Sequence, residues 1–175
     1  MNFAILGVFA FKECDWAIAS SVQMMVSHGV VSAAMFILVG MLYERHGVRT
    51  ITYYVGVVAL MPKYSFFVIF FTLANAGFPG LANFPAEFGI LASVCVTSLA
   101  QALFALVGLF LTGVYSFWFV NRIIFGGSYR QNGLVSPVYV DLDFREFFIL
   151  FQLALLTAVL GIRPDIVLDV INSSV

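Results

Sequence analysis

Charged side chains are scarce in this sequence of 175 residues, since aspartate, glutamate, lysine and arginine together make up only 10% of it. A soluble domain carries about 25% charged residues. Here 62% of the residues are hydrophobic, and the mean hydropathy is +1.05. The net charge is −1 and the sequence has no basic patch, so no nucleic-acid partner is expected. The composition predicts an all-α protein that crosses a membrane several times.

Cysteine is also rare, and Cys14 and Cys95 lie far apart in the sequence. Because no Cys-x-x-Cys or Cys/His cluster occurs, we expect no disulfide, zinc or iron–sulfur centre bound by this chain alone. Gly-x-Gly-x-x-Gly and P-loop patterns are absent as well, which argues against a nucleotide site. The first residues lack the Arg- and Ser-rich character of a transit peptide, so no removable targeting segment is expected. The sequence therefore predicts no cofactor and no metal in this chain.

Apolar stretches separated by short polar segments predict a single membrane domain with about five transmembrane helices, one of them discontinuous. A crossing needs about 20 residues. The predicted spans are Met1–Phe11 (about half a crossing), Trp16–Tyr43, Tyr64–Cys95 (broken between Gly77 and Phe84), Leu103–Phe125 and Phe147–Ile162. The segments between and after them are predicted to be an interfacial stretch at Ile51–Leu60, a polar loop at Gly126–Asp143 and a short tail at Asp165–Val175.

The third span is too long for one straight helix through a bilayer. At 1.5 Å per residue it would measure about 50 Å, against a hydrocarbon core of about 30 Å. Two glycines and two prolines interrupt it: Gly77, Pro79, Gly80 and Pro85. We therefore expect two half-helices, Tyr64–Gly77 and Phe84–Cys95, joined by an irregular link. Irregular backbone at membrane depth is tolerated only where protein buries it or water reaches it, and transporters build ion sites at such breaks.

Glu87 is the only formally charged side chain between Tyr64 and Asn121. One interpretation is that it caps the first turn of the second half-helix near Asn83, where the helix dipole favours negative charge. The other is that it is a proton relay, because ionisable groups inside a membrane usually serve transport. The two interpretations are compatible, and the sequence favours the relay.

His28 lies near the middle of the second predicted span, and Ser21 and Ser32 share its helical face at separations of seven and four residues. This polar stripe is suited to proton transfer through hydroxyls, imidazole and water. The alternative is a histidine that hydrogen-bonds to a neighbouring helix for packing only. Four other polar residues are predicted to make interhelical hydrogen bonds: Asn75, Thr112, Gln152 and Thr157.

Long segments of the chain resemble the C-terminal part of the NADH dehydrogenase subunit 4 family, an antiporter-like membrane subunit of respiratory complex I. They are SHGVVSAAMFILVGMLYERHGVRTI, MPKYSFFVIFFTLANAGFPGLANFPAEFGIL, YSFWFVNRIIFGG and DFREFFILFQLALLTAVLGIRPDIVLD. The resemblance implies the antiporter-like fold, of which this chain holds the C-terminal part of the second inverted repeat. It also implies that Glu87 terminates a chain of buried charged groups that carries protons, with His28 on the connecting hydrophilic axis. Related subunits carry lysine where Glu87 stands, and subunit 5 has lysine at the position of Ser32.

By this resemblance the chain forms the outward half of a proton path in a proton-translocating NADH:ubiquinone reductase. It would perform no redox catalysis itself, and flavin and iron–sulfur clusters are expected in partner subunits. The implied location is the mitochondrial inner membrane, with the bacterial plasma membrane as the alternative. Two other functions stay open: a subunit of a monovalent cation/proton antiporter, and a structural fragment that completes the membrane arm without conducting.

The resemblance also predicts partners, because the family has many more helices than this chain. We expect the N-terminal fragment of the same subunit on another chain from a split gene, with an incomplete chain as the alternative. Subunits 2 and 5, other membrane-arm subunits and lipids are further expected partners. Pro85-Ala86 replaces the branched residue and glycine usual in the family, so the second half-helix is expected to start at a shifted position.

The distribution of positive charges predicts how the chain is oriented. Six basic residues flank one set of loops: Arg45, Arg49, Lys63, Arg122, Arg130 and Arg145. Only Lys12 and Arg163 flank the other set. Because positive charges stay on the cytoplasmic or matrix side, Arg130 is predicted to face inward and Val175 outward.

Side-specific labelling in sealed vesicles tests this orientation. Single cysteines at positions 130 and 175 would be introduced with the two native cysteines replaced by serine. A membrane-impermeant thiol reagent added from the matrix or cytoplasmic side should modify position 130 and leave position 175 unmodified. Modification of position 130 from the outer side would reverse the orientation.

Overall fold

The computed structural model describes residues 16–51, 54, 56–126 and 140–172, and the regular elements of this part are all helical. They are α2 (Trp16–His46), the 3-10 helix η3 (Val57–Ala59), α3 (Pro62–Asn75), α4 (Asn83–Thr97), α5 (Leu99–Ile123), α6 (Phe144–Ile162) and α7 (Asp165–Asn172). The predicted all-α membrane fold is confirmed. The predicted half-span Met1–Phe11 and most of the predicted loop Gly126–Asp143 lie outside the described residues.

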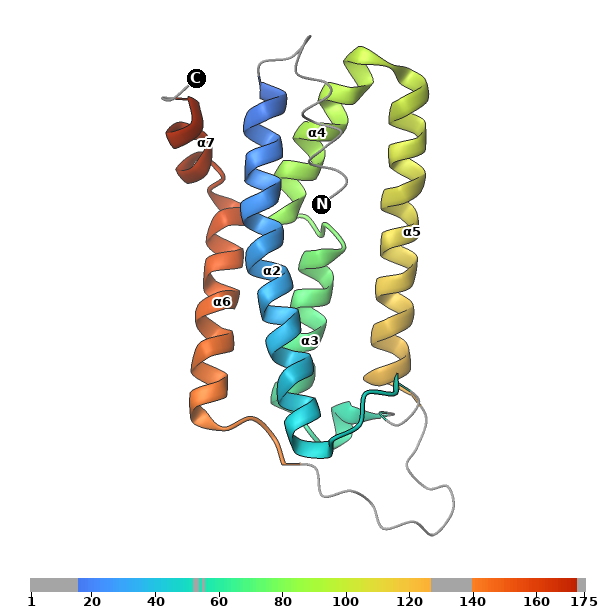
Figure 1. The fold of residues 1–175 in the computed structure, drawn as a ribbon, viewed down its shortest axis with the longest axis vertical. Coiled ribbons are helices and arrows are strands. Elements are labelled where there is room, and N and C mark those ends of the chain that lie inside the picture. Colours follow the sequence, from blue (N-terminus) through green and yellow to red (C-terminus); the bar gives the residue numbers. More distant parts are fainter. Residues whose placement is uncertain (1–15, 52–53, 55, 127–139, 173–175) are drawn as a thin grey trace.

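The long helix α2 lies in the middle of the bundle, with α3 and α4 stacked end to end alongside it (Figure 1). The chain runs along α2 in one direction, returns through α3 and α4, and reverses again at α5. Helix α6 then runs in the direction of α3 and α4 on the side of α2 away from α5 (Figure 1). Contacts between α2 and each of α3, α4 and α6 make it the element on which the bundle is assembled.

Three of the helices are long and apolar enough to cross a membrane: α2 with 31 residues, α5 with 25 and α6 with 19. Helices α3 and α4 have 14 and 15 residues, so each is too short to span the hydrocarbon core alone. Stacked end to end, they form the predicted discontinuous helix. Helix α3 begins at Pro62, two residues before the expected start, because proline suits a first helical position whose N–H would be unpaired anyway.

The break between α3 and α4 is an ordered turn that satisfies the helix end from within. Gly77 adopts φ +71°, and its N–H donates to the carbonyl of Ala74 at 3.3 Å. The N–H of Phe78 donates to the carbonyl of Leu73 at 3.1 Å. This pair of bonds around a left-handed glycine is the Schellman arrangement. It ends α3 at Asn75, two residues before the expected Gly77.

Helix α4 begins at Asn83, one residue earlier than expected, and Pro85 is its third residue. Proline is accepted there because N–H groups in the first turn of a helix have no partner within it. At the other end of the chain, the expected short tail instead forms helix α7. The carbonyl of Pro164 accepts hydrogen bonds from Val167 and Leu168 at 3.0 and 3.1 Å, which starts this helix.

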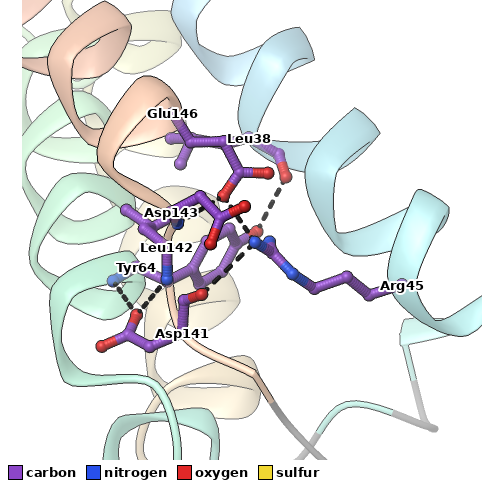
Figure 2. A network of polar contacts seen from close by, with 7 residues as sticks. All are labelled: Leu38, Arg45, Tyr64, Asp141, Leu142, Asp143 and Glu146. Atoms are coloured by element: carbon purple, nitrogen blue, oxygen red, sulfur yellow. Dashed lines mark hydrogen bonds and ion pairs between the residues drawn. The ribbon is translucent and has the colours of Figure 1, made fainter.

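A polar network ties the loop ends of α2, α3 and α6 together (Figure 2). Arg45 in the last turn of α2 pairs with Glu146 in the first turn of α6 at 2.5 Å, and it donates to the carbonyl of Asp141 at 3.3 Å. The Asp141 carboxylate accepts the N–H groups of Lys63 and Tyr64, each at 3.2 Å. The Tyr64 hydroxyl then donates to the carbonyl of Leu38 on α2 at 3.1 Å. The start of the broken helix is thereby fixed to its neighbours.

The Asp141 carboxylate should stabilise the bundle because it accepts two otherwise unpaired N–H groups of α3. We expect Asp141→Ala to cost about 1 kcal/mol, as for loss of a helix cap. The midpoint of thermal denaturation in mild detergent should fall accordingly. Lys63→Ala is the matched control, since it removes an exposed side chain and keeps the backbone N–H. Equal midpoints for the two variants would show that this cap contributes nothing.

Candidate functional site

Glu87 on α4 is buried in the structure, with 9% of its surface exposed. It is the fifth residue of α4, and the first turn of this helix contains no acidic residue. Our alternative interpretation of Glu87 as a first-turn cap is therefore wrong. The reason is that α4 starts one residue earlier than predicted, which moves the carboxylate past the unpaired N–H groups. Glu87 is an intrahelical carboxylate inside an apolar segment.

The carboxylate of Glu87 lies directly against the backbone of Gly77, across the break in the discontinuous helix. A Cβ atom built at Gly77 would overlap Oε2 of Glu87, so only glycine leaves room for the carboxylate in this position. Gly77 therefore has two structural roles, because the same residue also supplies the positive φ of the turn. The sequence identified Gly77 as an interruption of the helix but gave no sign of this contact.

No cation in the described part of the chain neutralises Glu87. The ion pair of this part joins Arg45 and Glu146 at the loop end, and Glu87 does not take part in it. A charged carboxylate at membrane depth without a partner costs several kcal/mol. Such a group must therefore be protonated, meet water, or receive a counter-charge from outside the described residues. Protonation, contact with water and a nearby counter-charge are each compatible with a carboxyl group that exchanges protons.

His28 is half-buried on α2, and the structure does not bring it into contact with Glu87. Ser20 packs directly on Gly89, so the antiparallel α2 and α4 place Glu87 level with residues 22 and 23. His28 lies about one and a half turns further along α2. Its predicted stripe partners bond to their own helix instead. Ser21 donates to the carbonyl of Ala17 at 2.7 Å, and Ser32 donates to that of Gly29 at 3.2 Å.

Three further buried polar residues of α2 and α4 were not identified as candidates from the sequence. Gln23 and Ser27 on α2 are 2% and 1% exposed, and Asn83 on α4 is 1% exposed. Gln23 and Ser27 are four residues apart, as are Asn83 and Glu87, so each pair occupies one face of its helix. This spacing was visible in the sequence. His28 lies on a different face of the same helix.

The other predicted interhelical hydrogen bonds have mixed outcomes. Asn75 on α3 donates to the hydroxyl of Tyr115 on α5 at 3.0 Å, as predicted. The prediction is wrong for Thr112 and Thr157, which donate to Gly108 and Leu153 within their own helices at 2.9 and 2.8 Å. A threonine hydroxyl reaches the carbonyl four residues back more easily than a neighbouring helix.

The described residues contain no group of three or more His, Cys, Asp or Glu side chains that could hold a metal ion. A cavity of about 380 Å³ lies at the loop end of α2, and its lining is mainly apolar. Leu38, Tyr64 and Phe119 line it, whereas Glu87 and His28 do not. The chemistry that the described residues offer at this position is therefore that of the Glu87 carboxyl group against the backbone of Gly77.

Comparison of the chain with known proteins identifies a matching family and similar sequences. Residues 1–112 match the family described as NADH:quinone oxidoreductase/Mrp antiporter, transmembrane. The chain is similar to NADH-ubiquinone oxidoreductase chain 4 from Chondrus crispus, with 40% identity over 99% of this chain and 34% of the relative. It is also similar to NADH-quinone oxidoreductase subunit M from Rhodobacter capsulatus, with 34% identity over 100% of this chain and 33% of the relative.

A solved structure shows the same fold. A chain of respiratory complex I from Thermus thermophilus with bound NADH matches with a TM-score of 0.81 and 26% identity, over 93% of this chain and 33% of that chain. The chain thus spans about a third of the length of the relatives that it matches. The predicted multi-pass membrane location is confirmed by the family match and by the three apolar helices.

The contact between Gly77 and Glu87 predicts an energetic coupling across the break. Gly77→Ala should destabilise the protein both through its positive φ, by about 1–2 kcal/mol, and by displacing the carboxylate. In a Glu87→Ala background only the first cost should remain. The coupling should amount to about 0.5–3 kcal/mol in a double-mutant cycle measured from thermal midpoints. Gly80→Ala is the control, because Gly80 has φ +93° with nothing within 4 Å of its Cβ position.

A cycle that shows equal coupling to Glu87 for Gly77 and Gly80 would contradict this assignment. It would mean that alanine at either position disturbs the turn as a whole. A coupling confined to Gly77 would show that the glycine positions the carboxylate.

Proposed function

The chain belongs to the NADH:quinone oxidoreductase/Mrp antiporter membrane family, and we propose that it forms the outward half of a proton path in the membrane arm of an NADH:quinone oxidoreductase. Glu87 is the group that takes up and releases the proton. The observation that carries this proposal is the buried carboxylate, which lies against the broken backbone of a discontinuous helix and has no cation paired with it among the described residues.

Physical reasons support this role for Glu87. A carboxyl group at membrane depth is expensive to keep charged and has no packing advantage over a neutral side chain. The break in the helix brings backbone and carboxylate together near the middle of the discontinuous helix, where transporters of several folds bind their ions. His28 is proposed to connect Glu87 to the rest of the hydrophilic axis, through water or through groups of other chains, because it does not contact Glu87 directly.

The proposal includes the partners that the rest of the path requires. The relatives named NADH-ubiquinone oxidoreductase chain 4 are about three times as long as this chain. We propose that the part of the fold that this chain does not span supplies basic groups near Glu87. Subunits 2 and 5 would adjoin it in the mitochondrial inner membrane. Redox catalysis would then occur on flavin and iron–sulfur clusters held by other subunits, and this chain would contribute only to proton movement.

The substitution Glu87→Gln tests the proposed relay because it preserves shape and hydrogen bonding but abolishes titration. A positioned proton-transfer group contributes about 10²–10⁴-fold to a rate. NADH-driven proton translocation in reconstituted vesicles, normalised to assembled complex, should therefore fall by at least about tenfold. NADH:quinone turnover should slow with it, since the two processes are coupled. His28→Ala should give a milder defect, because water can bridge the gap in a polar stripe.

The internal control is reduction of artificial acceptors at the flavin site, which should remain normal in the Glu87→Gln complex. Normal assembly combined with full proton translocation would remove Glu87 from the mechanism. The function of the chain would then be structural, as a component that completes the membrane arm.

A further inference from the structure

Among the helical glycines of the described residues, only Gly161 in the last turn of α6 packs on the backbone of another element. A Cβ atom built there would lie 2.5 and 2.6 Å from the carbonyl carbon and the Cα atom of Leu81, and it would overlap the carbonyl oxygen of Gly80. A Cβ atom at Gly40 would meet nothing within 4 Å, and one at Gly89 would meet only a side chain of α2. Since glycine weakens a helix relative to alanine, its presence at position 161 is explained by this contact.

Helix α6 is held along its length, so its last turn does not easily move away from the break. Leu150 and Thr157 are buried, and they share one face of α6 with Gly161 at separations of seven and four residues. The start of α6 is fixed to α2 by the pair of Arg45 and Glu146, and α7 contacts α2 beyond its end. In Figure 1 the helix ends at the height of the break between α3 and α4.

The link between α3 and α4 is the non-helical partner in this contact, and it is therefore the part that can move. Gly77 and Gly80 in the link have φ angles of +71° and +93°. The N–H of Leu81 donates to the carbonyl of Phe78 at 3.1 Å, and the N–H of Phe84 donates to the carbonyl of Leu81 at 3.2 Å. Through these bonds a displacement of Leu81 is passed on to both half-helices.

The link is enclosed by its neighbours and carries the contact with the carboxylate. The side chain of Leu81 forms a buried cluster with Val31 of α2 and Ala74 of α3. The backbone of the same residue packs on α6, so the link is confined between α6, α2 and α3. Gly77, in the same link, packs against the carboxylate of Glu87. A change in the position of the link therefore changes the surroundings of the carboxyl group.

We propose that Gly161 is a positioning residue for Glu87. Because it lacks a side chain, α6 packs directly on Gly80 and Leu81 and holds the link where Gly77 meets the carboxylate. The consequence for proton transfer rests on the relay function proposed above, whereas the positioning itself does not. Transfer depends steeply on geometry, since a misplacement of about 1 Å can cost about 10²-fold in rate.

The first test compares alanine at two helical glycines. Gly161→Ala places a methyl group against the backbone of the link, whereas the control Gly40→Ala has room for it. We expect Gly161→Ala to lower NADH-driven proton translocation, normalised to assembled complex, by about two- to tenfold. The loss should be smaller than in Glu87→Gln, because the carboxyl group is still present. Equal translocation in the two assembled glycine variants would overturn the proposal.

The second test asks whether Gly161 acts through Glu87. In a Glu87→Gln background, Gly161→Ala should not lower NADH:quinone turnover any further, because the group that it positions no longer titrates. A general disturbance of the bundle would instead lower turnover by the same factor in both backgrounds. That result would contradict a positioning role and leave only a structural one.

A second variant moves the link without adding an atom, and it applies even if Gly161→Ala prevents assembly. Leu81→Val keeps the contact with Gly161 and shortens the side chain that packs on Val31 and Ala74. We expect a loss of translocation smaller than that in Gly161→Ala, and again none in the Glu87→Gln background. Unchanged translocation in assembled Leu81→Val would contradict the dependence on the position of the link.

Cryo-electron microscopy maps of the assembled native and Gly161→Ala complexes separate the positioning from the relay. We expect Gly161 to contact Gly80 and Leu81 in the native map, and the link to be displaced in the variant. A gap between α6 and the link in the native map, or an unmoved link in the variant, would overturn the positioning. A displaced link with normal translocation in both Gly161→Ala and Glu87→Gln would keep the positioning and remove the relay.

Discussion

The hydrogen-bonding needs of a backbone inside lipid constrain every other feature of this chain. No water is available in the hydrocarbon core, so a helix that stops halfway must satisfy its last carbonyls and first N–H groups from within the protein. The structure meets this need locally. Gly77 and Phe78 bond back to α3, and Pro85 stands among the first residues of α4, where a missing N–H does no harm. The end of α3 at the interruption is consequently hydrogen-bonded from within the protein.

Side chains and backbone of other elements pack closely against the break in the discontinuous helix. On one side the carboxylate of Glu87 fills the space that a side chain at position 77 would occupy. On the other side Gly161 of α6 lies so close to the backbone of Gly80 and Leu81 that a Cβ atom would overlap it. Far from the break, the network around Arg45 and Asp141 fixes the beginning of α3 to α2 and α6. The half-helices are therefore held at the break and at the loop end, which gives the carboxylate a defined position.

Buried polar side chains of the described bundle are most numerous on α2 and α4. Large apolar side chains dominate the outer faces of α5 and α6; Phe104 and Phe110 are 82% and 72% exposed. Such faces suit lipid or neighbouring subunits. Helices α2 and α4 instead carry buried amides, hydroxyls and the carboxylate of Glu87. Close packing of Ser20 on Gly89 brings these two helices together.

The sequence alone determined the long apolar helices of the described part, because an apolar segment of about 20 residues has few alternatives to a helix in a membrane, whereas helix α7 was not predicted. It also identified the discontinuous helix and Glu87, since glycines, prolines and a lone charge stand out against an apolar background. Only the tertiary structure decided that the carboxylate of Glu87 packs against Gly77 and that Ser20 packs against Gly89. The second contact fixes the register of α2 against α4. Many registers satisfy the same apolar pattern, and the close approach of Ser20 to Gly89 selects one of them.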